Sequence, residues 1–183
     1  MQIGFYFDQS RCTGCYACVV ACRDKHDIQD THVSWRRLIE TETGAYPGVQ
    51  LSYLSLSCCH CAEPACAGAC PVEAIEKRTE DGIMTVDRQS CLGGDACGAC
   101  KDACPYHVPQ FSTGGDDKMQ MCTLCRDRLE QGKKPACVDA CPLYALDAGP
   151  LEELQKKYGA VKAVKGFAAS PKTKPSIIFK PRY

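Results

Sequence analysis

Cys12-Thr13-Gly14-Cys15-Tyr16-Ala17-Cys18-Val19-Val20-Ala21-Cys22 is the stretch that decides the fold. Its spacing, C-x2-C-x2-C-x3-C, is typical of proteins that hold a cubane iron–sulfur cluster. The first three thiols are near enough in sequence to bind one cluster together. Cys22 lies four residues beyond Cys18, so on a helix it keeps the same face but is displaced along the axis. Because such a cysteine can bind a second cluster, the rest of the chain should supply that cluster's other ligands.

Three further cysteine groups follow, with spacings close to the first. The second group reads C-x2-C-x4-C-x3-C-P, the third widens its first gap to five residues around Gly93-Gly94, and the fourth carries an eleven-residue insert. Together the four groups predict four [4Fe–4S] clusters. The cofactor-binding and iron-ligating residues are expected to be the sixteen cysteines Cys12, Cys15, Cys18, Cys22, Cys58, Cys61, Cys66, Cys70, Cys91, Cys97, Cys100, Cys104, Cys122, Cys125, Cys137 and Cys141.

Two residues inside the second group are not expected to bind iron. Cys59 is the seventeenth cysteine, and using it in place of Cys58 would break the two-residue spacing. His60 is expected to lie beside the ligands or at the surface, since four cysteines are already available. In the third group, where the gap after Cys91 is wide, a three-iron cluster or a cluster with a non-cysteine ligand is the alternative.

The composition disfavours other cysteine-rich classes. Cysteine makes up 17 of 183 residues, which in general indicates a disulfide scaffold, a metal protein or a cluster protein. No secretory signal precedes the first motif and the cysteine count is odd, so a disulfide framework is not expected. Zinc knuckles need no third closely spaced thiol, so a zinc-stapled interaction module is the weaker alternative. No apolar run approaches the length of a membrane span.

The charge balance also bears on partners. The 22 basic and 22 acidic side chains cancel, so bound clusters would make the loaded protein acidic. The last stretch, residues 162–183, is basic and has no Asp or Glu. No nucleic-acid-reading motif accompanies this stretch, so we expect no nucleic-acid binding, but an extended arm lying on a partner or on the cluster-binding body.

The sequence predicts an α+β fold built of short helices and strands. The segments that follow Cys70-Pro71 and Cys141-Pro142 are similar in sequence. This similarity indicates an internal repeat, in which a cysteine triplet is followed by a short helix, a Cys-Pro pair and a strand. The expected elements are a strand at 3–7, a helix at 18–25, hairpins at 33–39 with 49–53 and at 75–78 with 83–86, a surface loop at 126–136, and a helix at 151–158.

The sequence resembles the four-cluster iron–sulfur (beta, electron-transfer) subunits of the dimethyl sulfoxide reductase family of molybdenum and tungsten oxidoreductases. The resemblance covers nearly the whole chain. The residues that carry it are Cys12 to Cys22, Asp24-Lys25, Trp35-Arg36-Arg37, Cys58 to Pro71, Glu80 to Ile83, Cys104-Pro105-Tyr106 and Cys137 to Leu146.

Spacing alone leaves open whether neighbouring cysteine groups share clusters or whether the first group shares with the fourth and the second with the third. The resemblance implies the second, nested arrangement. Its four ligand sets are a first set of Cys12, Cys15, Cys18 and Cys141, a second of Cys22, Cys122, Cys125 and Cys137, a third of Cys58, Cys61, Cys66 and Cys104, and a fourth of Cys70, Cys91, Cys97 and Cys100. The wide gap makes Cys91 the least secure ligand.

The resemblance also implies the domain organisation. Two ferredoxin-like double [4Fe–4S] modules with short helices and β-hairpins are expected, together with the extended C-terminal arm. The first module comprises residues 1–57 and 106–160, the second residues 58–105, and the arm residues 161–183.

The implied function is electron transfer without catalysis, because no residue forms a convincing acid, base or nucleophile. The expected partner is a large molybdenum or tungsten bis-pterin catalytic subunit, with a membrane anchor or another electron carrier as a further one. The chain would be cytoplasmic, or exported folded with a signal-bearing catalytic subunit. A polyferredoxin of a hydrogenase or formate–hydrogen system is the alternative. Lys25, Arg11, Lys101 and Arg126 adjoin cysteines, and either raise cluster potentials or are ordinary surface charges.

Overall fold

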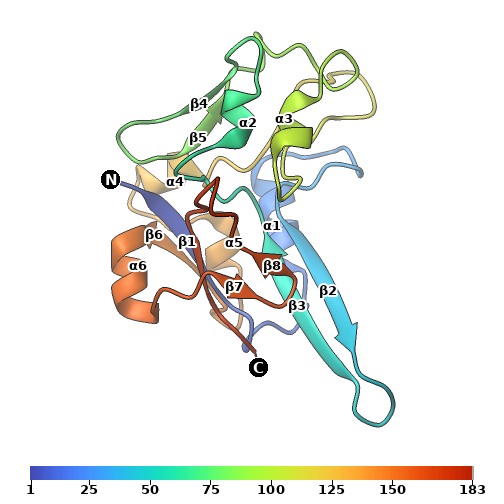
Figure 1. Cartoon of the computed structure of the whole chain (residues 1–183), viewed down its shortest axis with the longest axis vertical. Helices are drawn as coiled ribbons and strands as arrows, with labels where there is room; N and C mark the ends of the chain where they lie inside the picture. The colour runs from blue at the N-terminus through green and yellow to red at the C-terminus, as the bar shows by residue number, and fades with distance from the viewer. Residues whose placement is uncertain (183) are drawn as a thin grey trace.

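The computed structural model describes residues 1–182, which form a mixed α+β fold of short helices and small sheets. Its central sheet has the strand order β6-β1-β9. The middle strand, β1 (Ile3–Asp8), pairs antiparallel with β6 (Leu146–Pro150) and parallel with β9 (Ile177–Lys180). Residues near both ends of the chain therefore lie side by side in one sheet (Figure 1).

The two faces of this sheet have different coverings. Phe5 and Phe7 alternate along β1 and both enter the main core, which also holds many of the cysteines. Tyr6 points to the other face, where helix α6 (Leu151–Tyr158) closes a small second core and the Tyr158 ring stacks on Tyr6 at 3.8 Å between centroids. The predicted strand and the predicted α6 helix are thus confirmed.

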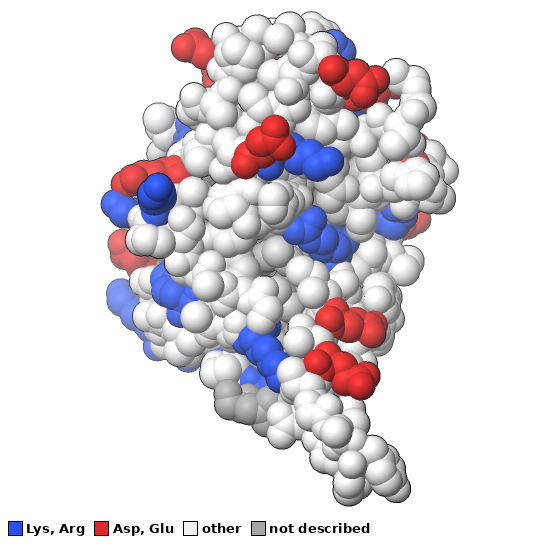
Figure 2. Space-filling view, turned by 45° about the vertical axis from the view of Figure 1, so that its right-hand side comes forward, with Lys and Arg blue, Asp and Glu red and all other residues white. Residues whose placement is uncertain are grey.

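The longest hairpin joins β2 (Arg37–Thr43) to β3 (Gln50–Leu56) and projects from the body (Figure 1). The hairpin was expected, but its first strand begins at Arg37 and not at Val33. Its tip, residues 44–49, contains no charged residue, and on the face seen in Figure 2 basic and acidic side chains are interspersed above it. No single large patch of one charge is visible on this face.

Four of the short helices pair across the chain. Helix α1 (Ala17–Lys25) packs on α5 (Ala136–Asp139), so the first cysteine group meets the fourth. Helix α2 (Ala65–Gly68) packs on α3 (Ala99–Ala103), so the second group meets the third.

The second helix pair lies beside another hairpin. This hairpin, β4 (Ile75–Lys77) with β5 (Met84–Val86), is the one predicted around Asp81-Gly82. It lies with α2 and α3 at the top of the molecule in Figure 1. Within the expected surface loop at 126–136, the structure instead forms helix α4 (Arg126–Leu129).

The C-terminal stretch corrects one prediction. Residues 161–182 do not form an extended arm: β7 (Ala163–Val164) and β8 (Phe167–Ala168) make a small hairpin, and β9 completes the central sheet. The physical reason is that Ile177, Ile178 and Phe179 are apolar and become buried on the edge of β1. Tyr183 lies outside the described residues. None of the helices formed by residues 1–182 is long and apolar enough to cross a membrane.

Candidate functional site

One cavity is lined by Cys12, Cys15, Cys18 and Cys141, the four thiols of the first set. Helix α1 brings in Cys18, while Cys141 arrives from the end of α5 more than a hundred residues later. Phe7 and Leu38 contribute apolar walls. Cys15 is exposed whereas Cys18 is buried, so this cavity has one wall at the molecular surface.

A second cavity has the same design. It is lined by the four thiols of the fourth set, and its walls include Pro71, Val72 and Ala74, which correspond to Pro142, Leu143 and Ala145 in the first cavity. The wide gap in the third cysteine group does not remove Cys91 from this cavity. Gly93 has φ +99°, a conformation that favours glycine, and so allows the longer loop to bulge. The set lining this cavity is Cys70, Cys91, Cys97 and Cys100.

The other two sets are more deeply placed. Burial raises the pKa of the Cys22 thiol, and the neighbouring thiols of Cys122, Cys137 and Cys125 raise it further. Cys22 therefore lies near the fourth cysteine group, although the other cysteines of its own group, Cys12, Cys15 and Cys18, line the first cavity.

The third set gathers in the same way. Burial raises the pKa of Cys66 to about 12, and the thiols of Cys104 and Cys61 add to the shift. Burial also dominates the raised pKa of Cys58, whose neighbours include Cys66. Helix pairs α1–α5 and α2–α3 thus bring the thiols of the first and fourth sets around two cavities, and they place Cys22 near the fourth cysteine group and Cys66 near Cys61 and Cys104.

Backbone amides donate to several of these sulfur atoms. The Ala74 N–H donates to Cys70 Sγ at 3.3 Å, and the Ala145 N–H donates to Cys141 Sγ at 3.2 Å, at the same four-residue offset in both repeats. Met119 N–H donates to Cys91 Sγ at 3.4 Å. Hydrogen bonds of this kind stabilise charge on sulfur and are one means by which a protein sets the potential of a cluster.

Two buried nitrogen atoms have no hydrogen-bond partner among residues 1–182, namely Arg36 Nε and His60 Nε2. Because the His60 Nδ1 accepts the Met84 N–H at 3.0 Å, the ring proton is on Nε2. Both nitrogens are therefore donors that lack an acceptor in a region rich in cysteine. No three His, Cys, Asp or Glu side chains of residues 1–182 converge as they would on one metal ion; the thiols line cavities. Four thiols around a cavity and unpaired buried donors nearby fit a cluster with sulfide acceptors.

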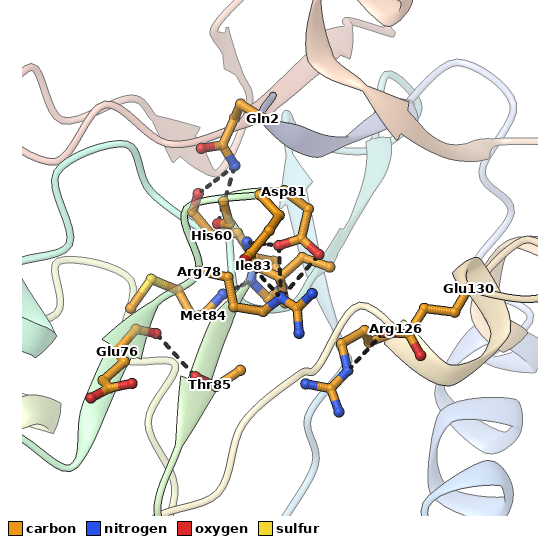
Figure 3. Close-up of polar contacts among 12 residues, drawn as sticks. Gln2, His60, Glu76, Arg78, Asp81, Ile83, Met84, Thr85, Arg126 and Glu130 are labelled. Atoms are coloured by element: carbon orange, nitrogen blue, oxygen red, sulfur yellow. Dashed lines mark hydrogen bonds and ion pairs between the residues drawn. The ribbon is translucent and has the colours of Figure 1, made fainter.

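The remaining candidates from the sequence lie in different surroundings. Cys59 is buried, and its thiol contacts the Ser57 carbonyl oxygen at 3.7 Å. Burial raises the pKa of Cys59, and the neighbouring Cys61 and Cys104 thiols add to the shift. His60 is completely buried and does not lie at the surface. Lys25 and Arg126 are half-exposed and form ion pairs with Asp127 at 2.6 Å and Glu130 at 3.4 Å, the latter drawn in Figure 3.

Arg11 and Lys101 do not enter the protein interior either. Arg11 pairs with Asp8 at 3.6 Å, and Lys101 is exposed. The buried cation of the site is instead Arg36, which stands out in the sequence only as part of the resemblance. The one available signal is a pair of small hydroxyl residues among apolar ones, Ser55 in the neighbouring strand β3 and Ser57 directly after it.

Comparison with known proteins agrees with this chemistry. A 4Fe–4S binding domain family matches residues 5–24, and a 4Fe–4S dicluster domain family matches residues 49–151. The chain is therefore a ferredoxin-type iron–sulfur protein that binds [4Fe–4S] clusters.

The relatives define the family more narrowly. The chain is 46% identical to the B subunit of the anaerobic dimethyl sulfoxide reductase of Escherichia coli (strain K12), over 98% of this chain and 89% of that protein. It is 40% identical to the B subunit of the same enzyme from Haemophilus influenzae, with the same coverage, and 33% identical to the formate dehydrogenase iron–sulfur subunit of Wolinella succinogenes, over 84% of each. The chain belongs to the iron–sulfur electron-transfer subunits of the dimethyl sulfoxide reductase family, and it is a non-catalytic subunit.

Proposed function

We propose that the chain holds four [4Fe–4S] clusters and relays single electrons between a molybdenum or tungsten pterin catalytic subunit and a redox partner. The observation that carries this proposal is that two cavities are each lined by four thiols, one by the first set and one by the fourth. Each bound cluster would accept or release one electron with little movement of its ligands. The chain's own residues hold the thiols in place, exclude water and direct amide donors at sulfur.

The proposed ligands follow the four sets. The first set binds one cluster, and Cys22 leaves its sequence neighbours to join the second. The ligand sets are Cys12, Cys15, Cys18 and Cys141; Cys22, Cys122, Cys125 and Cys137; Cys58, Cys61, Cys66 and Cys104; and Cys70, Cys91, Cys97 and Cys100.

Two ferredoxin-like modules accommodate these sets. Residues 1–57 with 106–160 supply the first and second sets, and residues 58–105 supply the third and fourth. Cys15 and Cys97 are the exposed cysteines, and they belong to the first and fourth sets. We place the two ends of the electron path at these sets, since electrons must enter and leave where a cluster approaches the surface.

The partner follows from the relatives. The names of the Escherichia coli and Haemophilus influenzae relatives place them in dimethyl sulfoxide reductase, and we infer a catalytic partner subunit of that type. A membrane anchor or another electron carrier would contact the opposite end of the path. The complex would function either in the cytoplasm or on the periplasmic side after export together with the catalytic subunit.

Metal analysis of the anaerobically purified chain tests the proposal. We expect about sixteen iron and sixteen acid-labile sulfide per chain, four of each per cluster. A large co-purifying subunit that carries a pterin would identify the partner, whereas a nickel-containing subunit would support the hydrogenase alternative. Finding about four zinc and no sulfide would contradict the cluster proposal.

The substitution Cys22→Ser tests the nested ligand sets. We expect it to perturb the cluster of Cys122 and to leave the cluster of Cys12 intact, as followed by electron paramagnetic resonance of the reduced protein. Cys59→Ser is the matched control, because it removes a buried thiol of the same region and should leave all four signals unchanged. Loss of the first cluster alone in Cys22→Ser would contradict the nested arrangement.

A further inference from the structure

Arg36 is a buried cation that has no carboxylate partner. It is 2% exposed, and none of the ion pairs formed within residues 1–182 includes it. Burying a guanidinium without a counter-charge is strongly unfavourable. The folded chain must therefore supply negative charge near Arg36 in some other form.

Neutral groups hold the guanidinium in one position. Nη1 donates to Ser55 Oγ at 3.0 Å, Nη2 donates to Ser57 Oγ at 2.9 Å, and the group lies over the Phe5 ring at 4.6 Å from its centroid. These contacts come from β3, the residue after β3, and β1. They fix the charge in place without neutralising it, and Nε remains without a partner among the described residues.

The negative charge that faces Arg36 comes from cysteine. Burial lowers the pKa of Arg36, but the thiols of Cys137, Cys122, Cys18 and Cys22 raise it, and the net direction is upward. Cys18 belongs to the first set and the other three belong to the second. The Arg36 charge thus interacts with thiols of two of the ligand sets, in a buried region where low polarity strengthens charge interactions.

Ser55 connects the guanidinium to one particular sulfur atom. Its Oγ accepts from Arg36 and lies 3.4 Å from Cys18 Sγ. A guanidinium can only donate, so the hydroxyl proton of Ser55 is left free to point at Cys18. Ser57 accepts from Arg36 in the same way, but no side-chain contact of Ser57 with a cysteine is seen among residues 1–182.

We propose that Arg36 is a positioning residue that raises the reduction potentials of the clusters bound by the first and second sets, directly by its charge and, at Cys18, also through the Ser55 hydroxyl. This inference rests on the proposed ligand sets. Reduction adds one electron to a cluster, supplied by the redox partner, and Arg36 keeps its proton throughout. A fixed positive charge favours the more negative, reduced state of both clusters.

Redox titration of the cluster-loaded protein, followed by electron paramagnetic resonance, tests the inference. In Arg36→Gln we expect two of the four clusters to become harder to reduce, each by at least about tenfold in the equilibrium constant, or about 59 mV for one electron. Arg36→Lys keeps the charge and should restore most of that shift. Arg126→Gln is the charge control: it removes an exposed, ion-paired arginine next to Cys125 and should shift no cluster by that amount.

The two serines provide a matched pair. Ser55→Ala should lower the equilibrium constant for reduction of one cluster by about threefold or more. That cluster should be one of the two affected in Arg36→Gln. Ser57→Ala removes an equivalent hydrogen bond to Arg36, but it should lower the equilibrium constant for reduction of that cluster by a smaller factor.

Iron and sulfide content, measured on every sample, separates the possible failures. Absence of clusters from the parent protein would defeat the proposed function. Full cluster content with unshifted potentials in Arg36→Gln would overturn the inference alone. If Arg36→Gln cannot assemble its clusters, equal potentials in Ser55→Ala and Ser57→Ala would overturn it.

Discussion

At the scale of the residue, His60 shows how the cysteine loops are fixed to the rest of the protein. Its Nδ1 accepts the Met84 N–H of β5, and its carbonyl oxygen accepts Ser176 Oγ at 2.9 Å and Gln2 Nε2 at 3.2 Å (Figure 3 shows the Gln2 and Met84 contacts). Burial lowers the pKa of His60 to about 3, so the ring is neutral at physiological pH. One residue between two cysteines therefore joins β5 through its side chain, and the N-terminal segment and the segment before β9 through its carbonyl oxygen.

Replacing His60 should destabilise the cluster-loaded chain. His60→Ala leaves a cavity and an unsatisfied buried Met84 N–H, and we expect a loss of about 3 kcal/mol in the free energy of unfolding. His32→Ala, at an exposed position, should change it by no more than about 0.5 kcal/mol. The midpoint of guanidinium unfolding measures both. Equal midpoints for the two variants would show that the His60 contacts contribute little.

His60 should also make the free energy of unfolding depend on pH. The folded pKa lies below the unfolded value of 6.5, so the unfolded chain binds the extra proton and stability falls as pH decreases below 6.5. The His60→Ala variant lacks this loss. Its deficit in unfolding free energy should therefore shrink by about 1 kcal/mol between pH 7.5 and pH 5.5. A deficit that is constant across this range would mean that His60 titrates alike in both states.

At the scale of the element, the parallel pairing of β1 with β9 depends on one small residue. A Cβ on Gly4 would lie 2.2 Å from the carbonyl oxygen of Ser176, the residue before β9. That oxygen also accepts the Phe5 N–H at 3.0 Å, so it cannot move away without loss of the strand pair. Glycine at this position is therefore a requirement of the sheet.

The substitution Gly4→Ala should weaken the sheet. We expect a loss of about 2 kcal/mol in the free energy of unfolding, because backbone atoms must shift to admit the methyl group. Gly68→Ala is the matched control: a Cβ there meets nothing within 4 Å, and alanine favours the helix by about 0.5 kcal/mol. Guanidinium midpoints of the loaded proteins compare them. An unchanged midpoint in Gly4→Ala would show that β9 adjusts freely.

Local signals explain which elements the sequence could predict. The Asp81-Gly82 turn and the helix over Leu151–Tyr158 are encoded by neighbouring residues, and both are confirmed. The partner of β9 lies about 170 residues away in sequence, which no local pattern reveals, and the stretch was therefore misread as an arm. Arg36 was missed for the same reason, since the direction in which an arginine of a hairpin turns depends on the distant residues that surround it.

The repeat is visible again in backbone conformations. Glu73, His107 and Tyr144 each follow a Cys-Pro pair by two residues, and all three have φ near +50°. None is glycine, so spacing rules based on glycine would not locate these turns. The cysteine spacing indicates the repeat, whereas only the structure reveals these turns, two of which direct the following amides, those of Ala74 and Ala145, at sulfur.

At the scale of the whole molecule, cysteine replaces part of a conventional apolar core. The main core contains Phe5, Phe7 and Met84 together with buried cysteines from all four groups. Empty, thiol-lined cavities in such a core forfeit packing contacts, and deprotonated thiols would repel one another. Metal binding and folding should consequently be coupled.

Removal of iron should unfold much of the chain. After anaerobic chelation we expect far-ultraviolet circular dichroism to lose most of its native signal, and readdition of iron and sulfide to restore it. Cys59→Ser keeps every proposed ligand and should behave as the parent chain does. A native-like spectrum without iron would show that the protein scaffold folds by itself.

The central sheet also has a consequence for synthesis on the ribosome. β1 is made before both of its neighbours, β6 and β9, which follow it by more than a hundred residues. An emerging chain can complete the region of α2 and α3 while its first strand still lacks any partner. Closure of the sheet must therefore wait until β9 has been made, so a chain terminated before β9 would lack the closed sheet.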